Sequence, residues 1–249
     1  MLFQPFSIAK HNEHYEGGYT ESALEWRRLG AIDKASNLQR MVGARSFDSV
    51  LEVGCGTGAV LAEVAMRGIG RIHTGVDLAD PEAHRDPIAD GLDLRIYDGQ
   101  TLPFPDAHFD LVYASHVVEH VPNPRHFLAE LARVARRAIY VEVPCELTAR
   151  VSRRRTQAAL DTGHINIYTP ESFMILLQSS GLRVQDIDLF DHSLDVQCFG
   201  TTRAIGNTRR WVRSSLLRCS PLIASRLFCY HCGALVVTEI GTESGQLST

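Results

Sequence analysis

Short apolar runs and longer amphipathic segments alternate through the middle of the chain. The short runs are typical of buried strands, and apolar positions that recur every three or four residues are typical of helices. The predicted strands cover 49–54, 71–77, 92–97, 109–114 and 137–143, with helices over 57–67 and 124–135. This alternation predicts a doubly wound, Rossmann-like α/β fold whose parallel sheet binds a ligand at the carboxyl ends of its strands.

Further elements are expected on both sides of this core. A helix is predicted from Thr20 to Val42, the segment 144–161 is expected to be irregular and basic, and Pro170 begins another helix. Two more strands are expected at 182–190 and 233–240. The chain is predicted to be a single domain, 1–249, composed of a helical lid segment 1–45, a cofactor-binding core 46–145, an acceptor-side half 146–240 with a helical insert at about 203–228, and a flexible tail 241–249.

The first predicted strand of the core ends abruptly in glycines. Gly54, Gly56 and Gly58 alternate with short side chains before the next helix begins. A turn without bulky side chains lets a ligand lie against backbone amides at a helix N-terminus, which predicts a nucleotide-like cofactor. Glu52, just before the turn, would repel a pyrophosphate, but it suits the positive amino and sulfonium groups of S-adenosylmethionine.

Two acids follow the next two predicted strands. Asp77 ends one strand, where a carboxylate can bind both hydroxyls of a ribose. Asp98 follows the next, where it can accept a hydrogen bond from an adenine amine. Because the carboxyl ends of parallel strands share one edge, we expect both acids to lie near the glycine turn.

Several segments resemble motifs of the class I S-adenosylmethionine-dependent methyltransferases. Residues 50–60, VLEVGCGTGAV, resemble the first motif of that family, and 97–112 resembles its "GD…LPFPD…FDLV" segment. Residues 117–124, VVEHVPNP, are similar to the stretch after its fourth strand, and 163–172, GHINIYTPES, resembles a turn before its last large helix. The subgroup that the chain resembles contains small-molecule methyltransferases of the ubiquinone-biosynthesis type.

The resemblance implies a mostly parallel, seven-stranded sheet with an antiparallel last strand, and S-adenosyl-L-methionine as the cofactor. It also implies a small-molecule methyl acceptor, and we expect the methylated atom to be an oxygen. Because the cofactor carries its own leaving group, the protein has mainly to align the acceptor. The expected cofactor-binding residues are Glu52, Gly54, Cys55, Gly56, Asp77, Leu78, Asp98, Gly99 and His116.

The candidate catalytic residues are His116, Glu119, His120 and His164. If the segment after the fourth strand is helical, the first three project to one side, and the topology can bring the loop of His164 over the same edge. One interpretation is a general base, His120 or His164, for an acceptor hydroxyl. Another is a divalent metal, held as in relatives with an "E-x-x-E-H…H" arrangement, although His116 replaces the first acid. A third is a structural role, which we rank before the base and the metal, so no metal ligand is predicted.

Composition narrows the class of protein. The formal net charge of −4 argues against a dedicated nucleic-acid binder. No apolar run is long enough for a transmembrane helix, and the first residues lack the pattern of a signal peptide. Scattered cysteines, including the lone pair Cys229 and Cys232, suggest reduced thiols rather than a disulfide framework or a zinc site. These features predict a cytoplasmic enzyme, and they leave its oligomeric state open.

Two peripheral segments have alternative interpretations. Tyr15, Tyr19, Trp26 and Arg27 either close over the cofactor, or Trp26 is ordinary core and the arginine pair at 27–28 is a solvated face. The segment 203–226 is rich in arginine, has no acid and carries interleaved apolar residues. We expect it to form a lid on the sheet edge, with peripheral contact to an anionic membrane as the alternative.

Rival functions come from the same motifs. Gly54, Gly56 and Ala59 also fit a dinucleotide fingerprint, which would make the protein an NAD-dependent oxidoreductase, but Glu52 and Asp98 argue against it. The remaining alternatives are a methyltransferase that acts on RNA or protein, and a nucleotide-binding protein without catalytic activity.

Overall fold

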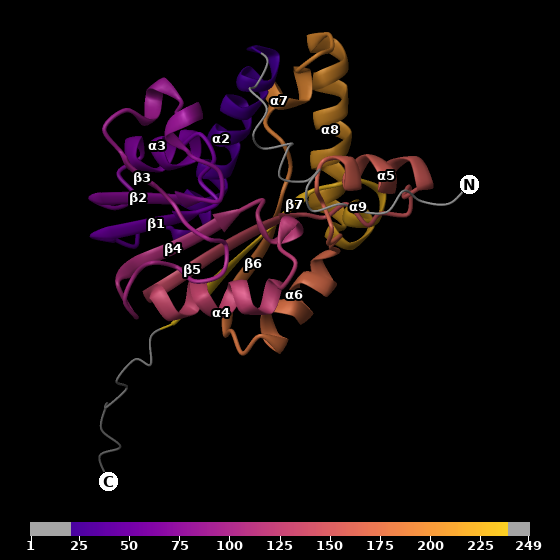
Figure 1. Ribbon diagram of the computed structural model, residues 1–249. Coiled ribbons are helices and arrows are strands. Elements are labelled where there is room, and N and C mark those ends of the chain that lie inside the picture. The colour runs from indigo at the N-terminus through magenta and orange to yellow at the C-terminus, as the bar shows by residue number, and fades with distance from the viewer. Residues whose placement is uncertain (1–20, 239–249) are drawn as a thin grey trace.

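The structure is a computed structural model that describes residues 21–238. The proposed contacts of Tyr15 and Tyr19 and the tail 241–249 lie outside the described residues. A seven-stranded sheet in the order β3-β2-β1-β4-β5-β7-β6 forms the centre (Figure 1). Its strands are β1 Ser49–Val53, β2 Ile72–Asp77, β3 Asp93–Ile96, β4 Phe109–Ser115, β5 Ala135–Pro144, β6 Val184–Phe190 and β7 His231–Val237.

Strand β7 runs antiparallel to both of its neighbours, β5 and β6, whereas the other pairs in the sheet are parallel. This confirms the predicted mostly parallel sheet with an antiparallel last strand. Strands β1 and β4 are buried along nearly their whole length, because helices cover both faces of a parallel sheet. The sequence of these two strands therefore shows continuous apolar runs rather than an alternating pattern.

Helices cover the sheet on both sides (Figure 1). One side carries α2 Glu21–Val42 and α3 Ala59–Met66, whose buried residues Leu38 and Leu61 belong to one apolar cluster. The opposite side carries α4 Pro124–Val134 and α6 Pro170–Ser179, whose Leu128 and Phe173 belong to a second cluster. The carboxyl edge of the sheet is left to loops and to the short 3-10 helices η1 Glu82–His84, η2 Pro87–Ala89 and η3 Val118–His120.

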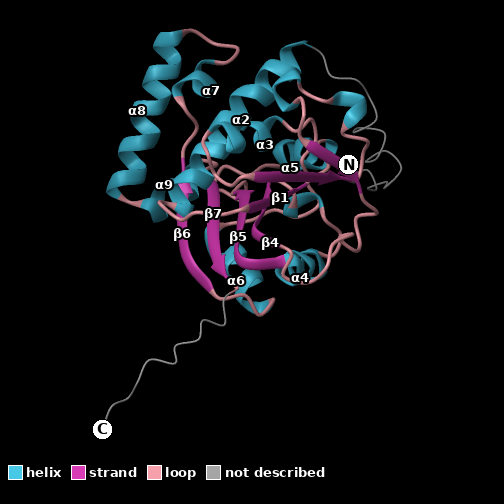
Figure 2. Ribbon diagram, turned by 90° about the vertical axis from the view of Figure 1, so that its left-hand side faces the viewer, coloured by secondary structure: helices cyan, strands magenta, loops and turns pink. Residues whose placement is uncertain are grey.

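The connection between β6 and β7 contains the predicted helical insert. It consists of α7 Leu194–Cys198, α8 Arg203–Cys219 and α9 Pro221–Leu227. Figure 2 shows α8 at the periphery, standing away from the sheet, with α7 at one end and α9 at the other. Within residues 21–238, no helix combines the length and the apolar character that a bilayer span requires.

One prediction about the secondary structure is wrong. The segment 144–161 was predicted to be irregular, but it contains helix α5, Arg153–Asp161. The Ser152 hydroxyl caps this helix by accepting a hydrogen bond from the Arg155 amide. None of the helix residues is buried. A helix that buries no face shows no apolar periodicity, so the pattern used for the prediction could not reveal it.

Candidate cofactor and acceptor site

The glycine turn joins β1 to α3 in a conformation that other residues adopt only with strain. The φ angles are 82° at Gly54, 51° at Gly56 and 77° at Gly58. A Cβ atom on Gly54 would lie 2.4 Å from the Val117 side chain, and one on Gly58 would lie 2.8 Å from Ala89. Above Gly56 the space is open, and the nearest atom is a guanidinium nitrogen of Arg27 at 3.9 Å. Gly56 is therefore the glycine that lets a ligand approach the backbone.

Asp77 ties the end of β2 to this turn. One carboxylate oxygen accepts a hydrogen bond from the Gly56 amide at 2.7 Å, and the other accepts one from the Ala79 amide at 3.1 Å. Burial raises the pKa of Asp77, and the two amides partly oppose that rise. Each carboxylate oxygen keeps a free lone pair, so the group can still accept hydrogen bonds from two hydroxyls of a ligand.

Glu52 is a carboxylate enclosed under the turn. It is 1% exposed, and in the described part of the chain one of its oxygens has no hydrogen-bond partner. Burial raises its pKa to about 8, although the Tyr113 hydroxyl and the charge of Lys34 act in the opposite direction. An under-compensated buried carboxylate next to an open backbone cradle fits a cofactor that carries positive charge and no phosphate.

The other expected cofactor residues differ in which of their atoms can contact a ligand. Leu78 is 60% exposed, and it lies against Gly99, where a Cβ atom would come within 2.4 Å of its side chain. One oxygen of Asp98 accepts hydrogen bonds from the Gln100 and Thr101 amides, which lowers the pKa of Asp98. The Cys55 thiol packs inward against Gly75, so only the backbone of Cys55 can face a ligand.

The four candidate catalytic residues divide into two groups. The prediction that His116, Glu119 and His120 project together from a helix is wrong, because η3 begins only at Val118 and His116 has a φ of 60°. The His116 ring points into the sheet edge, where Nε2 lies 3.3 Å from a Glu142 oxygen and Nδ1 lies 3.6 Å from a Glu119 oxygen. Burial lowers the pKa of His116 well below its usual value.

His120 turns toward the later loop, as the topology suggested. Its Nδ1 lies 3.0 Å from the Gly163 carbonyl, and its ring meets the His164 ring at a centroid distance of 4.7 Å. His164 in turn pairs with Glu146 at 2.7 Å. The side-chain amide of Asn166 donates to the Val118 and Val121 carbonyls and holds the loop in place.

Glu119 lies between these two groups. It is completely buried, and within residues 21–238 neither carboxylate oxygen has a hydrogen-bond partner. Burial raises its pKa to about 7. Ligand atoms of Glu119, His120 and His164 lie within 4.8 Å of one another, so these three side chains can act on an acceptor proton or hold a metal ion.

Comparison with known proteins identifies the family. Residues 25–187, well over half of the chain, match the family described as a methyltransferase domain. The chain belongs to this family. It is a class I methyltransferase, and S-adenosyl-L-methionine is its cofactor.

Individual relatives of this methyltransferase are distant. It is 27% identical to 27-O-demethylrifamycin SV methyltransferase from Amycolatopsis mediterranei over 190 residues, which cover 71% of this chain and 69% of that protein. It is 36% identical to a probable chloroplastic tocopherol O-methyltransferase from Oryza sativa subsp. japonica, over 50% of this chain and 37% of that protein. The fold is similar to that of a geranyl diphosphate methyltransferase in complex with GPP and sinefungin, with a TM-score of 0.60, 16% identity and coverage of 83% and 77%.

The methyltransferase has a polar cluster that the sequence analysis missed. Glu142 on β5 is completely buried, and its carboxylate accepts hydrogen bonds from Asn37, Ser115 and Tyr140. His231, the first residue of β7, lies 3.3 Å from the same carboxylate. Burial opposes ionisation of Glu142, but the contacts with His116 and His231 outweigh it and hold the pKa well below its usual value. The available signal was a charged residue inside the apolar run 137–143.

Two arginines of helix α2 lie close to the glycine turn or to the loop after β2. Arg28 pairs with the buried Asp86 at 3.0 Å, and Arg27 lies over Gly56. Arg28 is nevertheless exposed, as the interpretation of a solvated face predicts, whereas Arg27 is half-buried. Trp26 is 43% exposed and packs on Phe199 at a centroid distance of 5.1 Å, so it is not ordinary core.

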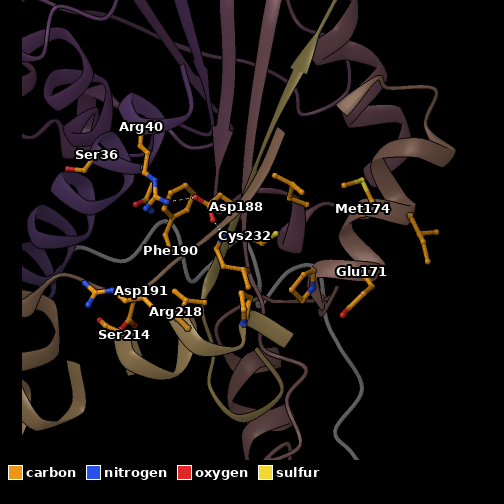
Figure 3. A pocket seen from close by; sticks show the side chains of 17 residues that line it. Ser36, Arg40, Glu171, Met174, Asp188, Phe190, Asp191, Ser214, Arg218 and Cys232 are labelled. Atoms are coloured by element: carbon orange, nitrogen blue, oxygen red, sulfur yellow. Dashed lines mark hydrogen bonds and ion pairs between the residues drawn. The ribbon is translucent and has the colours of Figure 1, made fainter. Parts of the chain in front are cut away.

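A groove of about 1110 Å³ lies at the opposite end of the sheet, between α2, α6, α8 and the edge strand β6. Figure 3 shows Arg40 and Asp188 pointing toward each other across it, and their charged groups are 2.6 Å apart. Three strands separate β6 from the glycine turn after β1, which corresponds to about 19 Å. Methyl transfer needs direct contact between donor and acceptor, so the part of the groove along β6 is too far away to hold the reacting atom.

Proposed function

We propose that this methyltransferase transfers the methyl group of S-adenosylmethionine to an oxygen atom of a small-molecule acceptor. The observation that carries this proposal is the fixed tautomer of His120. A carbonyl can only accept, so the 3.0 Å contact with the Gly163 oxygen places the proton of a neutral His120 on Nδ1. Its Nε2 is then the unprotonated ring nitrogen, which is the form that a general base for a hydroxyl requires.

The names of the relatives support an oxygen acceptor. One is named for 27-O-demethylrifamycin SV and the other as a probable tocopherol O-methyltransferase, and both names refer to small molecules. The formal charge of −4 also favours a small-molecule acceptor over RNA.

The residues around the glycine turn have separate roles in this proposal. Gly56 lets the methionine part lie against the backbone, Gly54 makes room for the Val117 side chain beside it, and Glu52 faces the positive groups of the cofactor. The carboxylate of Asp77 accepts from the ribose hydroxyls. Asp98 and Gly99 border the adenine edge, and the exposed Leu78 covers one of its faces.

The chemical step needs little from the protein. The cofactor, when bound, supplies an electrophilic methyl group and a neutral thioether leaving group. His120 Nε2 removes the proton from the acceptor hydroxyl as the oxygen forms its bond to the methyl carbon. His164, paired with Glu146 and packed on the His120 ring, holds that ring in position. His116 takes no part in this step, because its ring is turned into the sheet edge against Glu142, and Glu119 lies between the two histidine groups.

The test combines binding and turnover. Calorimetric titration with S-adenosylhomocysteine is expected to show one site, which Asp77→Ala removes and Asp93→Ala, in an exposed ion pair, leaves intact. Formation of S-adenosylhomocysteine is then followed with 27-O-demethylrifamycin SV, a tocopherol and matched amines as acceptors. His120→Asn is expected to lower kcat about 100-fold without changing the affinity for S-adenosylhomocysteine. Methylation of amines alone, or an unchanged kcat in this variant, would contradict the proposal.

We also propose that α8 and α9 contact an anionic membrane surface. The segment from Arg203 to Leu227 contains no acid, and Trp211 is 71% exposed beside the exposed Arg209 and Arg210. A basic helix with exposed apolar side chains has charge and shape complementary to acidic headgroups.

Co-sedimentation with vesicles tests this second proposal. We expect binding to vesicles that contain phosphatidylserine and none to vesicles of phosphatidylcholine. The double variant Arg209→Glu/Arg210→Glu is expected to weaken binding at least about tenfold, because each cation near the surface contributes about 1 kcal/mol. Arg71→Glu, at an exposed position far from α8, is the control. Equal binding by both variants, or binding to RNA instead of vesicles, would refute it.

A further inference from the structure

Three side chains of the types that bind metals converge from three different strands. His116 follows the end of β4, Glu142 lies on β5 and His231 begins β7. One ligand atom from each lies within 4.8 Å of the other two. Glu142 and His231 are buried, and His116 is 19% exposed at its side chain, although its Nε2 atom is buried.

The distances in this group fit ligands around an ion better than hydrogen bonds. Nε2 of His116 and Nδ1 of His231 each lie 3.3 Å from the same oxygen, Oε1 of Glu142. A strong contact between an imidazole N–H and a carboxylate is shorter, at about 2.7–2.9 Å. Ligands held about 2.0–2.1 Å from a tetrahedral ion lie about 3.3 Å apart. In addition, Nε2 of His116 is buried and makes no hydrogen bond to any residue that the structure describes.

The surroundings of Glu142 fix which oxygen faces the histidines. Oε2 accepts hydrogen bonds from the Asn37 amide at 3.0 Å and from the Tyr140 hydroxyl. Oε1 accepts a hydrogen bond from the Ser115 hydroxyl at 3.3 Å and faces the two histidines. Partners of this kind, which orient a ligand through its second oxygen, are typical of metal centres. The His192 ring packs on His231 at a centroid distance of 4.5 Å and restrains that imidazole.

We propose that His116, Glu142 and His231 form a binding site for a divalent first-row transition metal ion. Two imidazoles and one carboxylate suit zinc, cobalt or iron rather than magnesium or calcium, which prefer oxygen ligands alone. The carboxylate of Glu119, 3.6 Å from His116, adds negative charge next to the site, and Lys34 is the cation nearby, with its amine 3.5 Å from the Ser115 carbonyl. This inference goes beyond the proposed function, which needs no metal.

A second group of ligand-type side chains, Glu119, His120 and His164, is close enough to compete for an added ion. Two of its histidines already have partners, since His120 Nδ1 contacts the Gly163 carbonyl and His164 pairs with Glu146. The experiment must therefore distinguish the two groups.

Cobalt(II) is the probe, because its visible spectrum reports ligand number and type. The full-length protein is stripped with a chelator and titrated with Co²⁺. We expect one Co²⁺ per chain, with absorption bands of a site of low coordination number. His231→Gln is expected to weaken binding at least about 100-fold, since changes to second-layer partners already cost 10–100-fold. His164→Gln is the matched control from the competing group and is expected to bind like the wild type.

Two further measurements keep the test decisive if His231→Gln unfolds, which its melting temperature will show. Asn37→Ala changes only a partner of Glu142 and is expected to weaken Co²⁺ binding about 10–100-fold. In the wild type, histidine ¹⁵N spectra with Zn²⁺ should show shifts of His116 Nε2 and His231 Nδ1, but not of His120 or His164. Absence of stoichiometric binding, or binding that is lost in His164→Gln alone, would overturn the proposal. The S-adenosylhomocysteine titration is independent of this result.

Discussion

At the scale of single residues, Glu52 shows how a buried charge prepares a site for a cationic ligand. Its carboxylate lies on a strand that is buried over 50–53, and one of its oxygens has no hydrogen-bond partner among the described residues. In the absence of ligand, the carboxyl group keeps its proton at neutral pH, because burial raises its pKa to about 8. Binding of a cation would favour the ionised form, which couples cofactor binding to proton release.

This raised pKa gives a prediction about stability. Between pH 4.5 and 8 the folded state holds a proton on Glu52 that the unfolded state has lost. The contribution of Glu52 to the free energy of unfolding therefore decreases as the pH rises through this window, and it is constant above it. Glu52→Gln removes that dependence.

Urea denaturation of the ligand-free protein checks this. Wild type and Glu52→Gln are expected to be similar near pH 5, and the variant is expected to be the more stable at pH 8.5. The control is Glu82→Gln. Pairing with Arg85 lowers the pKa of the exposed Glu82, so this variant should not become more stable relative to the wild type as the pH rises. A constant difference between wild type and Glu52→Gln across the range would contradict the assignment.

A second prediction concerns Gly56. Gly56 and Gly91 both have positive φ angles, of 51° and 77°, and neither has a close neighbour that would clash with a new methyl group. Replacement of either glycine by alanine should lower the free energy of unfolding by about 1–2 kcal/mol, because the backbone is then strained. Only Gly56→Ala puts the methyl group where the cofactor lies, which should weaken S-adenosylhomocysteine binding by about tenfold, in line with overpacking costs of about 1–3 kcal/mol.

Calorimetry and thermal melts of the two glycine variants separate strain from ligand contact. If Gly91→Ala weakened ligand binding as much as Gly56→Ala, the effect would be one of general destabilisation, and the cradle would not be at Gly56.

At the scale of elements, the loop 163–166 is built onto η3 by backbone bonds. The amides of Ile165 and Asn166 both donate to the Glu119 carbonyl at 2.9 Å. The Asn166 side chain adds two more bonds, to the carbonyls of Val118 and Val121. This docking places His164 against His120. From the sequence we predicted only that the topology can bring the loop of His164 to the same edge of the sheet.

Asn166 is therefore a positioning residue. Asn166→Ala leaves two carbonyls without their donor and should cost about 1–3 kcal/mol of stability. We expect kcat to fall about tenfold through misplacement of His164, with the affinity for S-adenosylhomocysteine unchanged, because the glycine turn is not involved. The exposed Asn207 on α8 provides the control, Asn207→Ala. Loss of cofactor affinity in parallel with kcat would show a purely structural effect.

At the scale of the whole molecule, one continuous sheet links the cofactor turn to the acceptor-side strands. Strand β7 is the last strand of the described chain, but it lies between β5 and β6 rather than at the edge of the sheet. We expect a single cooperative unfolding transition, consistent with one domain. S-adenosylhomocysteine at 100 times its Kd should raise Tm by about 5–10 °C, since that excess contributes about 2.7 kcal/mol.

Differential scanning calorimetry tests this prediction. NAD at the same concentration is expected to leave Tm unchanged. Two separate transitions, of which only one responds to the ligand, would show that the two halves unfold independently.

The sequence by itself determined the order of strands and helices and the place of the cofactor turn. These features depend on neighbouring residues: the apolar run 50–53 followed by alternating glycines specifies a buried strand and an open turn wherever it occurs. The nearby acids, Asp77 and Asp98, could be assigned to the same edge because parallel strands end together. Helix α5 escaped detection because it buries no residue and so leaves no periodic signal.

Only the tertiary structure decided which charged side chains meet. Glu142 and His231 are brought together by the antiparallel pairing of β5 with β7, and no local pattern specifies a contact across so much intervening chain. His116 joins them because its positive φ angle turns its ring into the sheet edge, whereas the sequence suggested a helical grouping with His120. Local periodicity encodes which residues are buried, but pairing between distant strands decides which buried polar groups become partners.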